Sequence, residues 1–164
     1  MNALLEGREA LATPKAPPRT IIRTVRFGHD TLDTDDHRRA VLAMAHDLGA
    51  QLRDTSTVAR TVALSVWFAD RSSTSRSCTL PETTDHTRAL TTAADTVLGT
   101  LALQRARVRA ISMTLELGDP AAAAHQLNFD PADKRQRRLE AATDRARRRF
   151  GPTAIGPAAL YRAA

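Results

Sequence analysis

The stretch from residue 60 to residue 80 constrains the fold more than any other part of the chain. In its first half, apolar side chains occupy alternate positions, at Val62, Leu64, Val66 and Phe68. This period of two is typical of a β-strand with one buried face. Polar turn residues follow at 69–73, and residues 74–80 form a second extended segment. The pattern predicts a β-hairpin.

Each side of this hairpin carries one helical and one extended pattern. Upstream, residues 20–27 are β-branched and extended, and Gly28 ends the strand. A helix is predicted over 35–53, with Asp33 or Thr34 as its cap. Downstream, a second helix is predicted over 85–103, capped by Thr84 or Asp85, and a last strand over 108–117.

The resulting order, β-α-β-β-α-β, predicts an α+β fold of two layers. Four strands would form an antiparallel-type sheet, and both helices would cover one of its faces. The other face would stay open to solvent or to a ligand. The side chains predicted to lie on that open face alternate with the apolar ones and are Ala63, Ser65, Trp67, Ser112 and Thr114.

The two ends of the chain have a different character from its centre. Residues 1–18 contain three prolines and are interpreted as a linker or the remnant of a larger protein, and residues 19–118 as the folded domain. Residues 119–164 form a tail with a basic helix predicted from 131 to 149. The apolar stripe of this helix is thin, comprising Leu139, Ala142, Ala146 and Phe150. We therefore expect it to dock weakly or to be mobile.

The formal charge of +6 and pI near 10.8 come almost entirely from arginine, since Lys15 and Lys134 are the only lysines. Guanidinium groups suit phosphate recognition, although a coding bias toward arginine gives the same composition. Position along the chain must decide between the two.

Cysteine and histidine usage argues against metal chemistry. Cys78 is the only cysteine, which excludes an internal disulfide and a cysteine-based zinc site, and the five histidines lack ligand spacing. We therefore expect neither a metal nor a cofactor. No segment is apolar for long enough to be a signal peptide or to span a membrane, so a soluble, cytoplasmic protein without membrane contact is expected.

Several of these segments together resemble a known family. The runs RTVALSVWFAD (60–70), SRSCTL (75–80) and RVRAISMTL (107–115) occur in the order seen in the little-finger domain of Y-family translesion DNA polymerases, specifically the DNA polymerase IV group. The run DRARRRFGPTAI (144–155) is similar to the C-terminal segment of actinobacterial members. The resemblance covers roughly residues 19–160.

The resemblance implies an accessory domain that binds damaged or primer–template DNA along its backbone during translesion synthesis and DNA repair, without sequence specificity. It implies no catalysis by this chain, because the polymerase chemistry resides in palm and fingers domains that 164 residues cannot also contain. The only adjacent carboxylates, Asp35 and Asp36, are better explained as partners of a helix dipole than as metal ligands.

Residue by residue, the resemblance implies phosphate contacts at strand ends through guanidinium and hydroxyl groups. The implied DNA-binding residues are Arg19, Thr20, Arg60, Thr61, Arg76, Ser77, Arg107 and Arg109. At several other positions, among them Ala63, Ser65 and Trp67, relatives often carry Lys or Arg. Fewer charges displace fewer counterions, so binding is expected to be weaker than in a typical relative.

A second function class is a protein-interaction module that docks on a polymerase core or on the sliding clamp. Gln126, Leu127 and Phe129 resemble a short form of the clamp-binding peptide, with the two apolar side chains entering a groove and Gln126 bonding its rim. The peptide lacks its second leucine, and a local packing role for these residues is the alternative.

Overall fold

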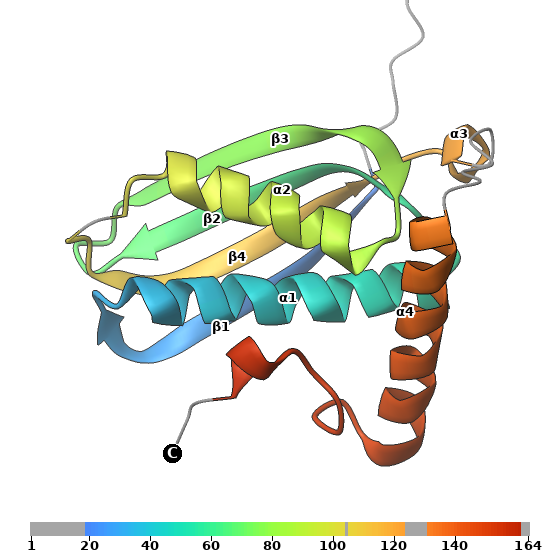
Figure 1. The fold of residues 1–164 in the computed structure, drawn as a ribbon. Coiled ribbons are helices and arrows are strands. Elements are labelled where there is room, and N and C mark those ends of the chain that lie inside the picture. The colour runs from blue at the N-terminus through green and yellow to red at the C-terminus, as the bar shows by residue number, and fades with distance from the viewer. Residues whose placement is uncertain (1–18, 104, 124–130, 162–164) are drawn as a thin grey trace, which may run out of the picture.

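The computed structural model describes residues 19–103, 105–123 and 131–161. The elements in chain order are β1 (Thr20–Thr31), α1 (Thr34–Asp54), β2 (Ala59–Phe68), β3 (Ser73–Thr84), α2 (Thr87–Thr100), β4 (Val108–Leu117), α3 (Pro120–Ala123), α4 (Pro131–Phe150) and the 3-10 helix η1 (Ala158–Leu160). The strands form one antiparallel sheet in the order β1-β4-β2-β3. Helices α1 and α2 lie side by side over one of its faces (Figure 1). The predicted two-layer α+β fold is confirmed.

The core lies between the sheet and these two helices. The alternation in β2 predicts its buried positions correctly, since Val62, Leu64 and Val66 are all fully buried. They lie in register with the buried residues of β4, and the opposing helical side chains are equally inaccessible to solvent. The core residues on β4, α1 and α2 include Ile111, Met113, Leu115, Val41, Leu48, Leu52, Leu90 and Ala94. Burial of this apolar surface is the main force that holds the two layers together.

The edge strands are longer than predicted. Strand β1 continues through Gly28 to Thr31, because its pairing with β4 becomes irregular between Arg26 and Thr31 and then resumes. Strand β3 continues past Pro81 to Thr84. A proline, which has no N–H to donate, is tolerated there because β3 is an edge strand.

The predicted cap of α2 is wrong, whereas that of α1 is confirmed. Asp33 accepts a hydrogen bond from the backbone N–H of Asp35 at the start of α1. Helix α2 begins at Thr87, with His86 at its N-cap position and no side-chain bond from that residue. Thr84 bonds only the N–H of His86, and the helix is capped from outside by a residue of α4, Glu140.

Gly49 allows α1 and α2 to approach closely. A Cβ atom at this position would lie 2.5 Å from the Thr87 side-chain oxygen and 3.4 Å from the Thr87 Cα. No real Cβ makes such a contact, so glycine is required where the end of α1 meets the start of α2.

Helix α4 docks through ion pairs and not through its apolar stripe. Leu139 and Phe150 are 61% and 69% exposed. On the opposite side, Arg53 of α1 makes a bidentate bond to Asp144, with N–O distances of 2.6 and 3.0 Å. The helix continues to Phe150, and Gly151 follows with φ +99°, the left-handed conformation typical of a glycine that ends a helix.

Candidate nucleic-acid interface

The sheet face opposite α1 and α2 is lined mostly by hydroxyl side chains. The strand registers place side chains of one row on one side of the sheet. The hydroxyl residues on the uncovered side are Thr20, Thr24, Thr61, Ser65, Ser73, Ser75, Ser77, Thr79, Ser112 and Thr114. Between them lie Ile22, Ala63, Ala110 and Trp67, and the charged residues of these rows are Arg26 and Glu116.

Some of these hydroxyls bond one another across strands. The hydroxyl of Thr24 donates to Ser112 at 3.0 Å, and that of Ser65 donates to Ser75 at 3.1 Å. An uncharged hydroxyl can donate to a phosphate oxygen at contact distance, but it supplies no long-range attraction. The attraction must therefore come from arginines at the ends of the strands.

One end of the sheet brings four predicted DNA-binding residues together. The Arg19 carbonyl accepts from the Leu117 N–H at 2.8 Å, and the Arg60 Cβ lies against Gly118, so both arginines flank the end of β4. Thr20 and Thr61 lie in one row, on either side of Glu116. This end can hold phosphate through two guanidinium groups, but Glu116 opposes it with a negative charge.

The other end contains Arg107 and Arg109, which precede or begin β4. Arg109 is an unpaired extra residue of a β-bulge, since Trp67 faces Ala110 whereas Phe68 faces Val108. Its guanidinium bonds the Asp30 carboxylate at 3.1 and 3.3 Å, and this bond raises the pKa of Arg109. Arg109 is thus partly neutralised within the protein.

Arg76 and Ser77 lie on opposite faces of the edge strand β3. Ser77 is in register with Ala63 on the uncovered face, whereas Arg76 is in register with the buried Leu64. Arg76 is therefore on the helix-covered side, although its side chain is exposed. The eight predicted residues do not form one continuous surface.

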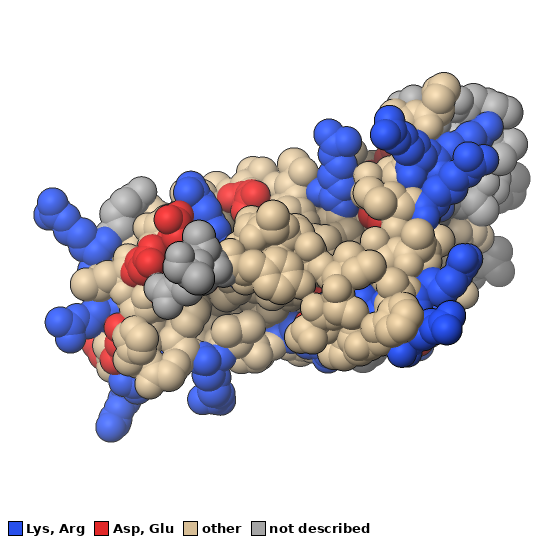
Figure 2. Space-filling model, turned by 60° about the horizontal axis from the view of Figure 1, so that its bottom comes forward, with Lys and Arg blue, Asp and Glu red and all other residues tan. Residues whose placement is uncertain are grey.

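Sequence reasoning missed Arg26, which lies on the uncovered face in the same row as Trp67 and Ala110. The signal that could have found it is the alternation of β1, where Arg26 follows Thr24 and Ile22 at a period of two. Trp67 is 39% exposed, and in this row Ala110 of β4 lies between it and Arg26. Figure 2 brings the α1 and η1 side of the molecule forward and not the uncovered sheet face; on the side in view, Lys and Arg lie mainly toward the two ends.

Other predictions from the sequence concern the clamp-binding peptide, metal binding, membrane spans and the single cysteine. Gln126, Leu127 and Phe129 lie outside the described residues. The described part of the chain holds no group of three potential metal ligands, and none of its helices is both long and apolar enough to cross a bilayer. Cys78 is half-buried, its Sγ lies 3.9 Å from the Ala93 carbonyl oxygen of α2, and burial raises the pKa of its thiol.

The fold and this surface define a small two-layer α+β domain with one uncovered, hydroxyl-rich sheet face and arginines at its ends. The chain belongs to the impB/mucB/samB family C-terminal domain, whose family model matches residues 18–139. This is the little-finger domain of Y-family DNA polymerase IV. The family resemblance expected from the strand motifs is confirmed.

Known relatives agree with this assignment. DNA polymerase IV from Desulfatibacillum aliphaticivorans is 29% identical over 153 residues, which are 90% of this chain and 39% of the relative. The chain thus spans about two fifths of that polymerase, and these 164 residues hold the little-finger domain without the catalytic domains.

Solved structures are similar to this chain at low sequence identity. DinB from Sulfolobus solfataricus matches with a TM-score of 0.52 and 13% identity, over 61% of this chain and 29% of that one. A complex of a beta-clamp processivity factor with the little finger domain of PolIV matches with a TM-score of 0.49 and 14% identity, over 68% of this chain and 96% of that one.

Proposed function

We propose that this domain binds the backbone of duplex or primer–template DNA, damaged DNA included, in translesion synthesis and DNA repair. The observation that carries the proposal is a family-typical sheet whose uncovered face has hydroxyl rows, with Arg26 on that face at one end of the sheet and Arg60 beside Gly118 at the other end. Hydroxyl and guanidinium groups bind phosphate oxygens without reading bases, so the binding has no sequence preference.

Anisotropy titration of a labelled primer–template at 50 and 200 mM salt tests the proposal. We expect a dissociation constant in the micromolar range that weakens steeply with salt and is the same for unrelated sequences. Replacing Arg26 and Arg60 with alanine removes about 0.9 from the salt slope for each lost phosphate contact. Arg76→Ala is the control for each of the two single replacements, because Arg76 lies on the covered side. Undetectable binding at low salt, or an equal loss in the control, contradicts the proposal.

Docking on the sliding clamp is a second candidate, favoured by the apolar pair of the peptide Gln126–Leu127–Asn128–Phe129 in the sequence. Leu127→Ala with Phe129→Ala should abolish capture of the chain by immobilised clamp and leave DNA binding unchanged. Capture that survives both substitutions removes this peptide from consideration. A polymerase core is the other partner of this class, and titration with it tests that docking separately.

The finer assignments follow from the same proposal. Residues 1–18 act as a linker, 19–118 as the DNA-binding unit and 119–164 as a tail, and the protein works at the nucleoid in the cytoplasm. Limited proteolysis that releases a stable fragment of 19–118 supports these boundaries, whereas unfolding of that fragment contradicts them. The similarity of 144–155 to actinobacterial members stays a prediction, and a wider set of relatives tests it.

A further inference from the structure

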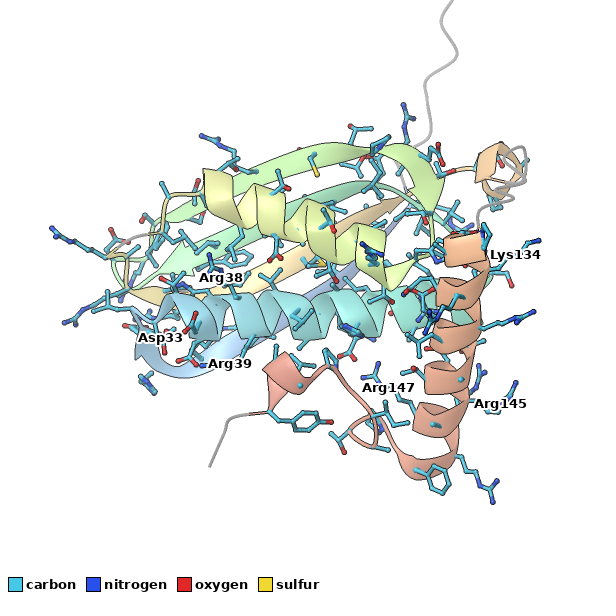
Figure 3. The ribbon with its side chains drawn as sticks, viewed as in Figure 1. Asp33, Arg38, Arg39, Lys134, Arg145 and Arg147 are labelled. Atoms are coloured by element: carbon cyan, nitrogen blue, oxygen red, sulfur yellow. The ribbon has the colours of Figure 1, made fainter. Side chains whose placement is uncertain are left out.

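Helix α4 separates its charges onto two sides. All its acidic residues, Asp133, Glu140 and Asp144, lie on the side that meets α1 and α2, where Arg53, His86 and Thr87 bind them. The opposite side carries basic residues and alanines and contains no acidic residue. The basic residues on this outward face, at helical spacing, are Lys134, Arg135, Arg138, Arg145 and Arg149. Figure 3 shows Lys134 and Arg145 pointing away from the body and Arg147 pointing back toward α1.

Most arginines of the outward face make no ion pair among the described residues, and Arg149 lies over the ring of Phe150, 5.3 Å from its centroid. Arg137, Arg147 and Arg148, on the flanks and the docked side, each pair with a carboxylate. Arg135, Arg138 and Arg145 are exposed and pair with no carboxylate among the described residues. Like charges spaced four apart on a helix, as in Arg145 and Arg149, repel each other. The bonds that the acidic side of α4 makes with α1 and α2 therefore stabilise the helix against repulsion among its outward arginines.

We propose that the outward face of α4 is a second DNA-binding surface, separate from the sheet, that contacts backbone phosphates. Arg138 and Arg149 are about 16 Å apart along the helix axis, which exceeds the roughly 12 Å width of the DNA major groove, so the stripe reaches both phosphate walls. Guanidinium groups match phosphate geometry bidentately.

The chemistry of this face favours DNA over other polyanionic partners. A membrane-surface helix needs an apolar side opposite its basic side, but the opposite side of α4 is a polar face docked on α1 and α2. A protein interface needs a central aromatic or aliphatic anchor, but only alanines lie among the central arginines, and the exposed Leu139 and Phe150 lie at the edge of the face. A surface with charge but no anchor suits a phosphate backbone.

The test compares two double variants of the whole chain that lose the same charge. Arg138→Ala with Arg145→Ala removes the centre of the outward face, and alanine preserves the helix. Arg38→Ala with Arg88→Ala is the control, on exposed positions of α1 and α2. In anisotropy titrations with a 20-base-pair duplex, we expect the α4 variant to lose about 1.8 from the salt slope and at least about tenfold in affinity near 0.1 M salt. The control should lose much less.

Affinity that is unchanged in the α4 variant, or lost equally in the control, overturns the inference. If the chain binds phosphatidylserine vesicles and the α4 variant does not, the ligand of the outward face is a membrane surface and the DNA proposal is wrong. This inference and the proposed function both concern DNA binding, but they assign it to different surfaces. If Arg26→Ala with Arg60→Ala has no effect while the α4 variant does, the sheet proposal fails and this one stands.

Discussion

The Oε1 atom of Glu140 accepts a hydrogen bond from the backbone N–H of Thr87 at 3.0 Å, so a carboxylate of α4 caps the first turn of α2. Helix α2 has no acidic residue in that turn. Burial raises the pKa of Glu140, but hydrogen bonds with His86 and Gln136 and the charge of Arg53 outweigh it, so the pKa lies below its ordinary value. The carboxylate is therefore charged and can interact with the helix dipole.

Glu140→Gln should destabilise the protein by about 1–2 kcal/mol, because an amide of the same shape loses the charge that caps α2 and pairs with Arg53. Urea unfolding measures the change, and amide exchange should speed up most at the start of α2. Glu82→Gln, at an exposed glutamate of β3, is the control and should change stability by less than about 0.5 kcal/mol. Equal effects would contradict a capping role.

The stabilisation by His86 should depend on pH. A hydrogen bond with Glu140 raises the pKa of His86 against the opposing effect of burial. Because the pKa is raised on folding, the contribution of His86 to the free energy of unfolding is complete below the unfolded-state pKa of about 6.5. This contribution is lost as pH rises through the higher folded-state pKa. The difference in unfolding free energy between the wild type and His86→Gln should therefore shrink above about pH 6.5.

The comparison with His86→Gln is needed because His37 and His46 act in the opposite sense. Burial lowers the pKa of both, so their contributions are lost as pH falls below about 6.5. Both histidines are present in the two proteins and cancel in the difference. A difference that stays constant from pH 5.5 to 8.5 would show that His86 is not charged in the folded state.

Gly49→Ala should destabilise the protein by about 1–3 kcal/mol, although alanine favours a helix by up to about 1 kcal/mol over glycine. The new methyl group would meet Thr87 and push α2 away from α1. Gly99→Ala is the control, because nothing lies within 4 Å of a Cβ there, and it should stabilise by about 0.5–1 kcal/mol. Thermal unfolding of both variants checks the opposite signs.

Glu116→Gln should raise DNA affinity by about two- to fivefold, because it removes a negative charge between Thr20 and Thr61 on the proposed interface. Asp95→Asn, on α2, changes the net charge by the same amount away from this face. If both substitutions raise the affinity equally, the uncovered face is not the binding surface.

Arg109 should contribute little to DNA binding until Asp30 is removed. Its guanidinium is bonded to that carboxylate, so Arg109→Ala alone should weaken binding by less than about twofold. Asp30→Asn frees the charge and should strengthen binding, and the gain should disappear when Arg109→Ala is added. Independent effects of the two substitutions in this double-mutant cycle would contradict the coupling.

The two layers were predictable from local patterns, because period-two and helical spacings of apolar residues show which side of each element is buried. Val62, Leu64 and Val66 are buried where the alternation placed them, and β4 has its predicted bounds. The open face also follows from this alternation, and Arg26 could have been assigned to it. These are local properties, since each depends only on a residue's neighbours along the chain.

The docking of α4, and the pairing of charges on the surface, depend on contacts between residues that are far apart in the chain. Glu140 is 53 residues from Thr87 in the sequence, and Asp30 is 79 residues from Arg109, so neither pairing leaves a local pattern. The sequence also could not show that Arg76 is in register with Leu64 and Ser77 with Ala63, because strand register depends on contacts between strands. Contacts between charges depend on distances that exist only in the folded chain. A one-residue shift of strand register would move every side chain of that strand to the other face of the sheet.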